Sequence, residues 1–165
     1  MTTINLPANA PRTSKEAFEY VGGLCNGATI DDLKILALVE AIGLELYTCM
    51  AQSTDNQAVR DLLMANGREE LIHGQRVAKA LEILTGEPFP LPSIDQNPLY
   101  TPMEMGPLTK EALNKLAEAE FAGGDLYAGV AASFDNEEAK ALFHQNGREE
   151  LEHGNRLARA AELLS

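Results

Sequence analysis

The sequence predicts an all-α protein, a four-helix bundle made of two antiparallel helix pairs, and two observations support this. Of the 165 residues 45% are apolar, alanine, leucine and glutamate abound, and there is no tryptophan, a composition that favours helices packed on helices. The second observation is an internal repeat: shifted by 80 positions, residues 40–84 align without a gap to 120–164 and match at 22 of 45 positions. This self-similarity indicates an internal duplication, so each half should fold as one helix pair.

The expected elements follow one another along the chain. Residues 1–28 form an N-terminal extension with a short helix around SKEAFEYV, and residues 29–165 form the bundle. The first bundle helix begins after Thr29, a favourable N-cap residue that is followed by two aspartates in the first turn. The sequences STDN and SFDN, at 53–56 and 133–136, turn the chain within each pair. The four bundle helices are expected at about 30–53, 55–85, 109–133 and 135–164.

Residues 87–108 connect the two pairs and hold six of the eight prolines, so they cannot form a long helix. Fully extended, these 22 residues would span about 70 Å, whereas a helix of about 30 residues is about 45 Å long. The crossover can therefore run the whole length of the bundle and start the third helix in the same direction as the second. A short turn, a long crossover and another short turn are the ferritin-like arrangement of a four-helix bundle.

The charge and the cysteines limit the class of partner and the location. With 13 basic and 25 acidic residues the net charge is −12, which repels nucleic-acid phosphates and anionic lipid, so neither is an expected partner. The first residues lack the apolar core of a secretory signal, and no run approaches the roughly 18 apolar residues of a membrane span. Cys25 and Cys49 form no disulfide framework or thiolate metal site and are interpreted as buried, inert thiols. We therefore expect a cytoplasmic protein.

Helical periodicity places one glutamate in the middle of an otherwise apolar stripe on every bundle helix. These four residues are Glu40, Glu70, Glu120 and Glu150. His73 and His153 follow two of them by three residues and so share their helix face. Four carboxylates inside a bundle would each cost several kcal/mol to desolvate and would repel one another. Either their pKa values rise until they are neutral, or cations lie among them.

Two divalent metal ions would balance the four carboxylates, and His73 and His153 would add one neutral nitrogen per metal. A glutamate from each of two helices and a Glu-x-x-His from each of the other two are the ligands of di-iron and di-manganese sites in ferritin-like bundles. Coordination that is rich in carboxylates and free of thiolates suits iron or manganese better than zinc or copper. The sequence therefore predicts two iron ions per chain, with manganese as the other metal considered. The alternative is a vestigial site that binds no metal.

Other residues near the predicted ligands have simpler interpretations. Asn66 and Asn146 are interpreted as core hydrogen-bonding residues, or alternatively as support for the ligands. Three glycines are costly in mid-helix and indicate close helix contact, or else space beside the metals for a small oxidant: Gly43, Gly123 and Gly124. Charged residues off the stripes are interpreted as solvated helix charges: Glu69, Glu149, Arg68, Arg148, Arg76 and Arg156.

The spacing of these residues also carries a resemblance. Each half contains Glu-x6-Tyr followed by Glu-x-x-His, first as Glu40, Tyr47, Glu70 and His73, then as Glu120, Tyr127, Glu150 and His153. The doubled motif resembles the rubrerythrin family of ferritin-like di-iron proteins over roughly residues 30–165. The resemblance implies the four glutamates and two histidines as metal ligands, and it implies a homodimer. It also implies that Tyr47 and Tyr127 stand near the site, where their hydroxyls could bond ligand carboxylates; core packing is the alternative.

The chain departs from this family in two ways. Full-length rubrerythrins carry a rubredoxin-like domain whose four cysteines hold an iron, and this sequence has no residues for it, so we expect electrons to come from another protein. Typical members also have an extra glutamate one turn after the third-helix ligand, where this chain has Gly123. That difference argues against the ligand shuttling associated with the extra glutamate and against peroxidase activity of the usual kind.

The expected function is a di-iron oxidoreductase in which hydrogen peroxide or dioxygen oxidises a diferrous centre, in oxidative-stress defence or iron handling. Peroxide reduction is favoured over ferroxidation for storage. The alternatives are a non-catalytic iron-binding or iron-buffering protein and a di-manganese catalase. An oxygenase acting on an organic substrate is less favoured, because the sequence offers no extra domain for a substrate channel. RNA modification is disfavoured by the acidity of the chain.

Overall fold

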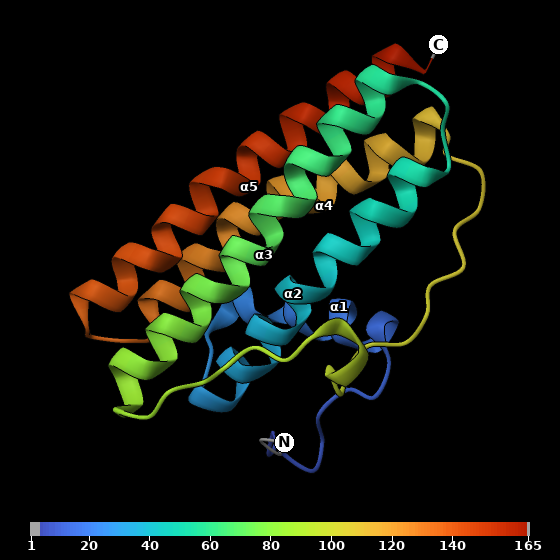
Figure 1. The fold of residues 1–165 in the computed structure, drawn as a ribbon. Helices are drawn as coiled ribbons and strands as arrows, with labels where there is room; N and C mark the ends of the chain where they lie inside the picture. Colours follow the sequence, from blue (N-terminus) through green and yellow to red (C-terminus); the bar gives the residue numbers. More distant parts are fainter. Residues whose placement is uncertain (1–3, 165) are drawn as a thin grey trace.

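The computed structural model describes residues 4–164, and within this range the ordered elements are all helical, with no strand. The described residues form four helices of 23 residues or more, and Figure 1 shows a shorter helix across one end of them. The prediction of an all-helical bundle is therefore confirmed. The elements are α1 (Ser14–Gly22), the short 3-10 helix η1 (Gly23–Asn26), α2 (Ile30–Gln52), α3 (Gln57–Thr85), the 3-10 helix η2 (Ile94–Gln96), α4 (Lys110–Ala132) and α5 (Glu137–Leu163).

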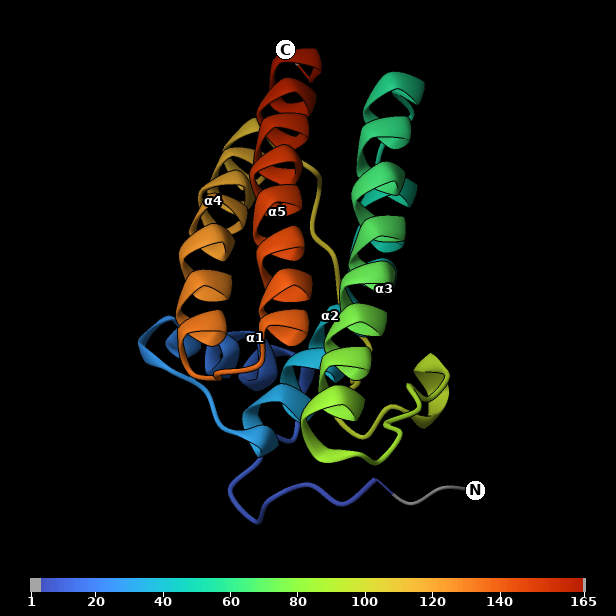
Figure 2. The ribbon, with the colours of Figure 1, turned by 90° about the vertical axis from the view of Figure 1, so that its left-hand side faces the viewer.

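The long helices pack as pairs. Helix α2 packs against α3, α4 packs against α5, and α3 also packs against α5, which joins the two pairs. The helices of each pair run in opposite directions (Figure 1). The crossover that connects α3 to α4 runs back along the length of the bundle, so α3 and α4 run in the same direction. Figure 2 shows α1 lying below α4, at the end where α2 begins.

The helix ends follow from capping side chains. Thr29 accepts a hydrogen bond from Asp32 N, and the Asp32 side chain accepts from Thr29 N, which makes a complete capping box at the start of α2. Asn56 and Asn136 occupy equivalent positions, and their side chains accept from amides in the first turns of α3 and α5. These asparagines start both helices two residues later than expected, at 57 and 137, while the other ends differ from expectation by at most one residue. Gly86, at φ 77°, ends α3 in the left-handed conformation.

The apolar core consists of two clusters with a polar layer between them. One cluster lies toward α1 and includes Leu36 of α2 and Phe143 of α5. The other cluster lies toward the opposite end and includes Met50 and Leu157. Along α3 and α5, the buried charged and amide side chains fall between these two clusters. A buried polar layer of this kind needs internal partners, because it has no access to bulk water.

The crossover and α1 contact α2, whereas η1 contacts α4. Asn97 of the crossover donates from Nδ2 to Leu38 O at 2.9 Å, and Leu38 is fully buried. Glu118, the equivalent residue of α4, is exposed. The Ser14 Oγ at the start of α1 donates to Thr101 O of the crossover at 3.1 Å, so α1 is tied to the same segment. The two halves of the chain therefore have different surroundings, although their helices correspond.

Two further expectations concern exposure. Cys25 is exposed and Cys49 is half-buried, so the interpretation of both as buried thiols was wrong; η1 holds Cys25 at the surface. Within residues 4–164, none of the helices has the length and apolar character that crossing a bilayer requires.

Candidate metal centre

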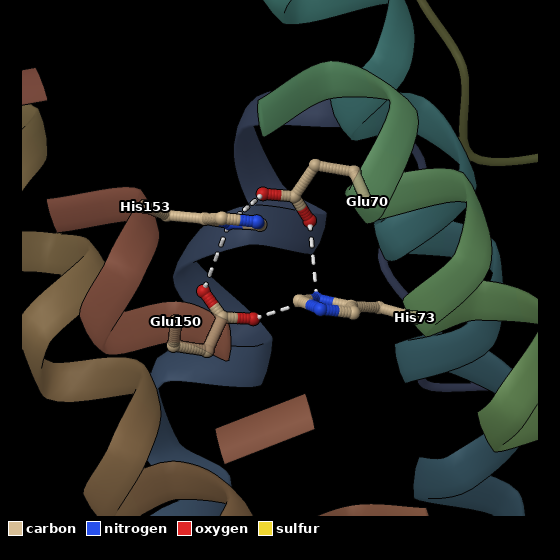
Figure 3. A group of neighbouring side chains, drawn as sticks. All are labelled: Glu70, His73, Glu150 and His153. Atoms are coloured by element: carbon tan, nitrogen blue, oxygen red, sulfur yellow. Dashed lines mark ion pairs between the residues drawn. The ribbon is translucent and has the colours of Figure 1, made fainter. Parts of the chain in front are cut away.

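Four buried side chains from α3 and α5 meet in the polar layer, and we refer to them as the quartet. They are Glu70, His73, Glu150 and His153, and each offers a ligand atom within 4.8 Å of the others. Figure 3 shows the two glutamates and the two histidines facing one another across the gap between their helices. Each helix supplies a Glu and a His three residues apart, so both side chains leave the same helix face. The quartet could hold a metal ion.

Glu40 of α2 and Glu120 of α4 lie beside the quartet. Glu40 Oε2 lies 3.7 Å from His73 Nδ1, and Glu120 Oε2 lies 3.9 Å from His153 Nδ1. Glu40 is buried and Glu120 is nearly so, with 12% of its side chain exposed. The structure therefore brings all six sequence-predicted ligands together.

The six side chains form two equivalent groups around the two Nδ1 atoms. His73 Nδ1 lies 3.0 Å from Glu150 Oε1, 3.9 Å from Glu70 Oε2 and 3.7 Å from Glu40. His153 Nδ1 lies 3.1 Å from Glu70 Oε1, 3.6 Å from Glu150 Oε2 and 3.9 Å from Glu120. Glu70 and Glu150 thus lie beside both histidines, whereas Glu40 and Glu120 each lie beside one. This grouping defines two adjacent candidate cation positions, which share the carboxylates of Glu70 and Glu150.

The orientation of the imidazoles favours a cation at each Nδ1. His73 Nε2 lies 3.0 Å from Glu149 Oε2, and His153 Nε2 lies 3.0 Å from Glu69 Oε2. Because these carboxylates can only accept, each Nε2 carries a proton, so a neutral ring would have its lone pair on Nδ1, and without metal that nitrogen binds a second proton. Both Nδ1 atoms are buried and have no hydrogen-bond partner of good geometry. A buried, unpaired nitrogen costs about 1–3 kcal/mol, a cost that a coordinated metal would remove. The residues present therefore fit a metal.

Two arginines bind the carboxylates of Glu149 and Glu69, which contact the Nε2 atoms of the histidines. Arg76 donates to Glu149 Oε2 at 2.5 Å and to Asn146 Oδ1 at 3.1 Å. Arg156 donates to both carboxylate oxygens of Glu69, at 2.7 and 3.1 Å. The interpretation of these four charged residues as solvated was wrong. Helices α3 and α5 pack side by side, so residues next to the apolar stripe of one helix contact the other helix. Their identity in both copies of the repeat was a signal that they share a role; Arg68 and Arg148 are exposed, as expected.

The tyrosines and asparagines connect the two halves of the chain. Tyr127 donates from its hydroxyl to Glu40 Oε1 at 2.7 Å, and Tyr47 donates to Glu120 Oε1. Asn146 Nδ2 donates to the Tyr127 hydroxyl at 3.1 Å and to His73 O at 3.2 Å. Asn66 makes the equivalent bonds, to the Tyr47 hydroxyl and to His153 O, both at 3.2 Å. Both tyrosines thus bond predicted ligands, and the asparagines support the site as well as filling the core.

Without metal, protons carry the positive charge of the site. Burial, together with repulsion from Glu150, Glu120 and Glu40, raises the pKa of Glu70 well above its usual range. Burial also raises the pKa of Glu120 to about 7, against the stabilising effect of His153. Burial lowers the pKa of His73, but the nearby carboxylates of Glu150 and Glu40 outweigh it and raise that pKa to about 11. The buried carboxylates are therefore stabilised by positive charge within the site, which protons or metal ions can provide.

The mid-helix glycines make room for the shared carboxylates. A Cβ at Gly43 would lie 2.7 Å from Glu70 Cγ, and a Cβ at Gly123 would lie 2.8 Å from Glu150 Cγ. A Cβ at Gly124 would meet Leu151 at 3.5 Å and Gly147 O at 3.6 Å, both ordinary contact distances. Close helix contact therefore explains the first two glycines, since a ligand side chain fills the space that each one leaves.

No protein-family model, curated protein or solved structure matches this chain. Its function therefore has to be inferred from the geometry of the site.

Proposed function

We propose that this chain is a rubrerythrin-like di-iron oxidoreductase with a ferritin-like fold that arose by internal duplication. The observation that carries the proposal is the pair of buried Nδ1 atoms without hydrogen-bond partners, on His73 and His153, each surrounded by three carboxylates. Carboxylates and imidazoles without thiolates suit iron or manganese. The duplication is supported by the reciprocal contacts across the halves, such as Tyr47 to Glu120 and Tyr127 to Glu40, which match at a shift of 80.

The protein residues provide charge balance and a fixed geometry. Four glutamates carry four negative charges, the number that two dications neutralise. Glu40 and Glu120 would each hold one ion, while Glu70 and Glu150 would be shared by both. Glu149 and Glu69 fix the ring orientation of the histidines from behind, and Tyr127 and Tyr47 hold one oxygen of each unshared carboxylate.

Two bound ferrous ions would supply the two electrons that, with two protons, reduce one hydrogen peroxide to two waters. The reductant that restores the ferrous state would be another protein, which we propose as a partner of this chain.

The test is metal analysis of the anaerobically purified protein, followed by optical titration with hydrogen peroxide and, separately, with dioxygen. We expect about two iron ions per chain and consumption of one peroxide per iron pair, with a slower reaction with dioxygen. His73→Ala and His153→Ala should lose iron. His144→Ala is the matched control, because His144 is exposed and lies outside the cluster. A wild-type protein that retains no iron or manganese would contradict the proposal.

A second candidate, a non-catalytic iron-binding protein, is favoured by one observation. The space in which a side chain at position 123 would begin is taken by Glu150, so the glutamate typical of the resembled family has no room there. Slow, reversible iron uptake without turnover of either oxidant in the same titrations would support this candidate over the oxidoreductase. Manganese in place of iron, with oxygen evolution from peroxide, would indicate a di-manganese catalase.

A further inference from the structure

A cavity of about 730 Å³ lies against the carboxylates of the candidate metal centre. Its inner end is lined by Glu40, Glu70, Glu120 and Glu150 and by both site tyrosines. Its outer part is lined by exposed residues such as Cys25, Ala119 and Ala122, so it opens to the surface. The cavity lies between α2 and α4, which do not pack closely against each other, and α1 and the crossover add further walls.

The cavity is too large for hydrogen peroxide or dioxygen alone, and its walls are mainly apolar. At roughly 30 Å³ per water, its volume corresponds to about 24 waters, whereas either oxidant has only two heavy atoms. The walls are mainly aliphatic, aromatic and methionine side chains: Phe18, Val39, Leu46, Met103, Leu116 and Leu126. Water gains few hydrogen bonds at such walls. The volume is within the range of about 300–1,000 Å³ that is typical of pockets for small organic molecules.

The charges around the cavity restrict its occupant. Four carboxylates form the inner end, and the outer part has two acidic residues, Glu19 and Asp125, against one base, Lys15. An anion would therefore be repelled along the cavity, and two dications at the inner end would balance the four carboxylates without creating a positive excess. The hydroxyls of Tyr47 and Tyr127 already donate to Glu120 and Glu40 and are not free to donate to a ligand.

We propose that this cavity is a binding site for an uncharged, mainly apolar organic molecule that lies directly beside the candidate metal centre. The proposal goes beyond the proposed function, because neither oxidant nor iron needs such a site. An organic substrate was disfavoured because the sequence offers no extra domain for a substrate channel. That reason no longer applies, since α1, α2, α4 and the crossover form the walls of the cavity without an additional domain.

The test uses two fluorescent probes of similar size, the neutral dye Prodan and the anionic dye anilinonaphthalene sulfonate, with the metal-free full chain. We expect saturable, blue-shifted Prodan binding at one dye per chain, and at least about tenfold weaker binding of the anion. Ala122→Trp would fill the cavity and should weaken Prodan binding at least about tenfold. Ala128→Trp is the matched control, because Ala128 is also an exposed alanine of α4 but does not line the cavity; it should leave binding unchanged.

The controls separate this inference from the proposed function. Circular dichroism checks the fold of each variant, and Ala119→Phe replaces Ala122→Trp if that variant does not fold. Iron binding by equilibrium dialysis is a separate readout, so a protein that binds Prodan but no iron overturns only the proposed function. Prodan binding that does not saturate, or that is equal in both tryptophan variants, would overturn the cavity proposal. A third outcome would also overturn the cavity proposal: the wild type does not bind Prodan, and sedimentation shows a dimer that only Ala122→Trp dissociates. A second copy of the chain would then cover the cavity.

Discussion

His73 of the first half is held from behind by Glu149 of the second half, with Nε2 and Oε2 3.0 Å apart. His153 has the same relationship to Glu69. Each histidine thus presents Nδ1 to the carboxylates of the site through a contact between α3 and α5. The orientation of a predicted ligand therefore depends on the packing of one half against the other.

Replacing Glu149 with alanine should weaken metal binding without unfolding the protein. The change leaves His73 Nε2 and one Arg76 interaction unsatisfied, so the ring loses its fixed tautomer and orientation. Loss of such a partner typically lowers metal affinity by about 10–100-fold. The measurement is Fe(II) affinity by anaerobic equilibrium dialysis, with helicity followed by circular dichroism. Glu138→Ala, an exposed position on the same helix, is the control. Equal affinities in the two variants would refute this role of Glu149.

Gly123→Ala should remove metal binding although alanine favours helix. The new Cβ would lie 2.8 Å from Glu150 Cγ, so the glutamate that both cation positions share has to move. Gly124→Ala is the matched control, since its Cβ makes only an ordinary contact and it should gain up to about 1 kcal/mol of helix stability. Metal content and urea unfolding of both variants check this prediction. A Gly123→Ala protein that binds metal like the wild type would show that Glu150 can be displaced without consequence.

The stability of the metal-free protein should fall as the pH rises from about 5 to about 9. Glu120 has a raised pKa of about 7, so its favourable contribution is present below its ordinary value of 4.5 and is lost as the pH rises toward 7. His73 has a pKa raised to about 11, so its contribution is present below 6.5 and is lost above that value. The pKa values of Glu40 and Glu150 are lowered against the opposing effect of burial, mainly by the histidines, and they add no slope in this range.

Urea unfolding in the presence of a chelator, at about pH 5, 7 and 9, measures this dependence. Added metal should reverse the trend, because the glutamates bind it only when deprotonated and their protonation competes at low pH. Glu120→Gln should flatten the part between about pH 5 and 7 and leave the part above it. A metal-free stability that rises over the whole range would show that the cluster does not hold these protons.

How much the sequence predicts differs between the ligands and their surroundings. Glu70 and His73 could be identified because helical periodicity is a property of one helix, and both residues lie on its apolar stripe. Glu69 and Arg76 could not be placed, because periodicity does not say which neighbouring helix covers the edge of a stripe. Their positions depend on the packing of α3 against α5.

The same distinction applies to the fold. The crossover could be placed from its prolines and its length, since both are local constraints. The starts of α3 and α5 were expected two residues early, because the capping bonds of Asn56 and Asn136 compete with continued helix in those turns. The cavity was not foreseen, since it results from the absence of close packing between α2 and α4, which neither helix encodes alone.

Substitution of shared and unshared glutamates should change the number of bound metal ions differently. Glu120 lies near His153 Nδ1 at 3.9 Å and belongs to one cation position, so Glu120→Ala should retain about one ion per chain at the position beside His73. Glu70 lies near both histidines, 3.1 Å from one Nδ1 and 3.9 Å from the other, so Glu70→Ala should lose both ions. Metal analysis after dialysis at a fixed free Fe(II) concentration distinguishes one from two. Glu118→Ala, an exposed glutamate of α4, is the control and should keep both ions. If Glu120→Ala and Glu70→Ala had equal stoichiometry, the two glutamates would not differ in the way that their distances indicate, and the two cation positions would not be separable.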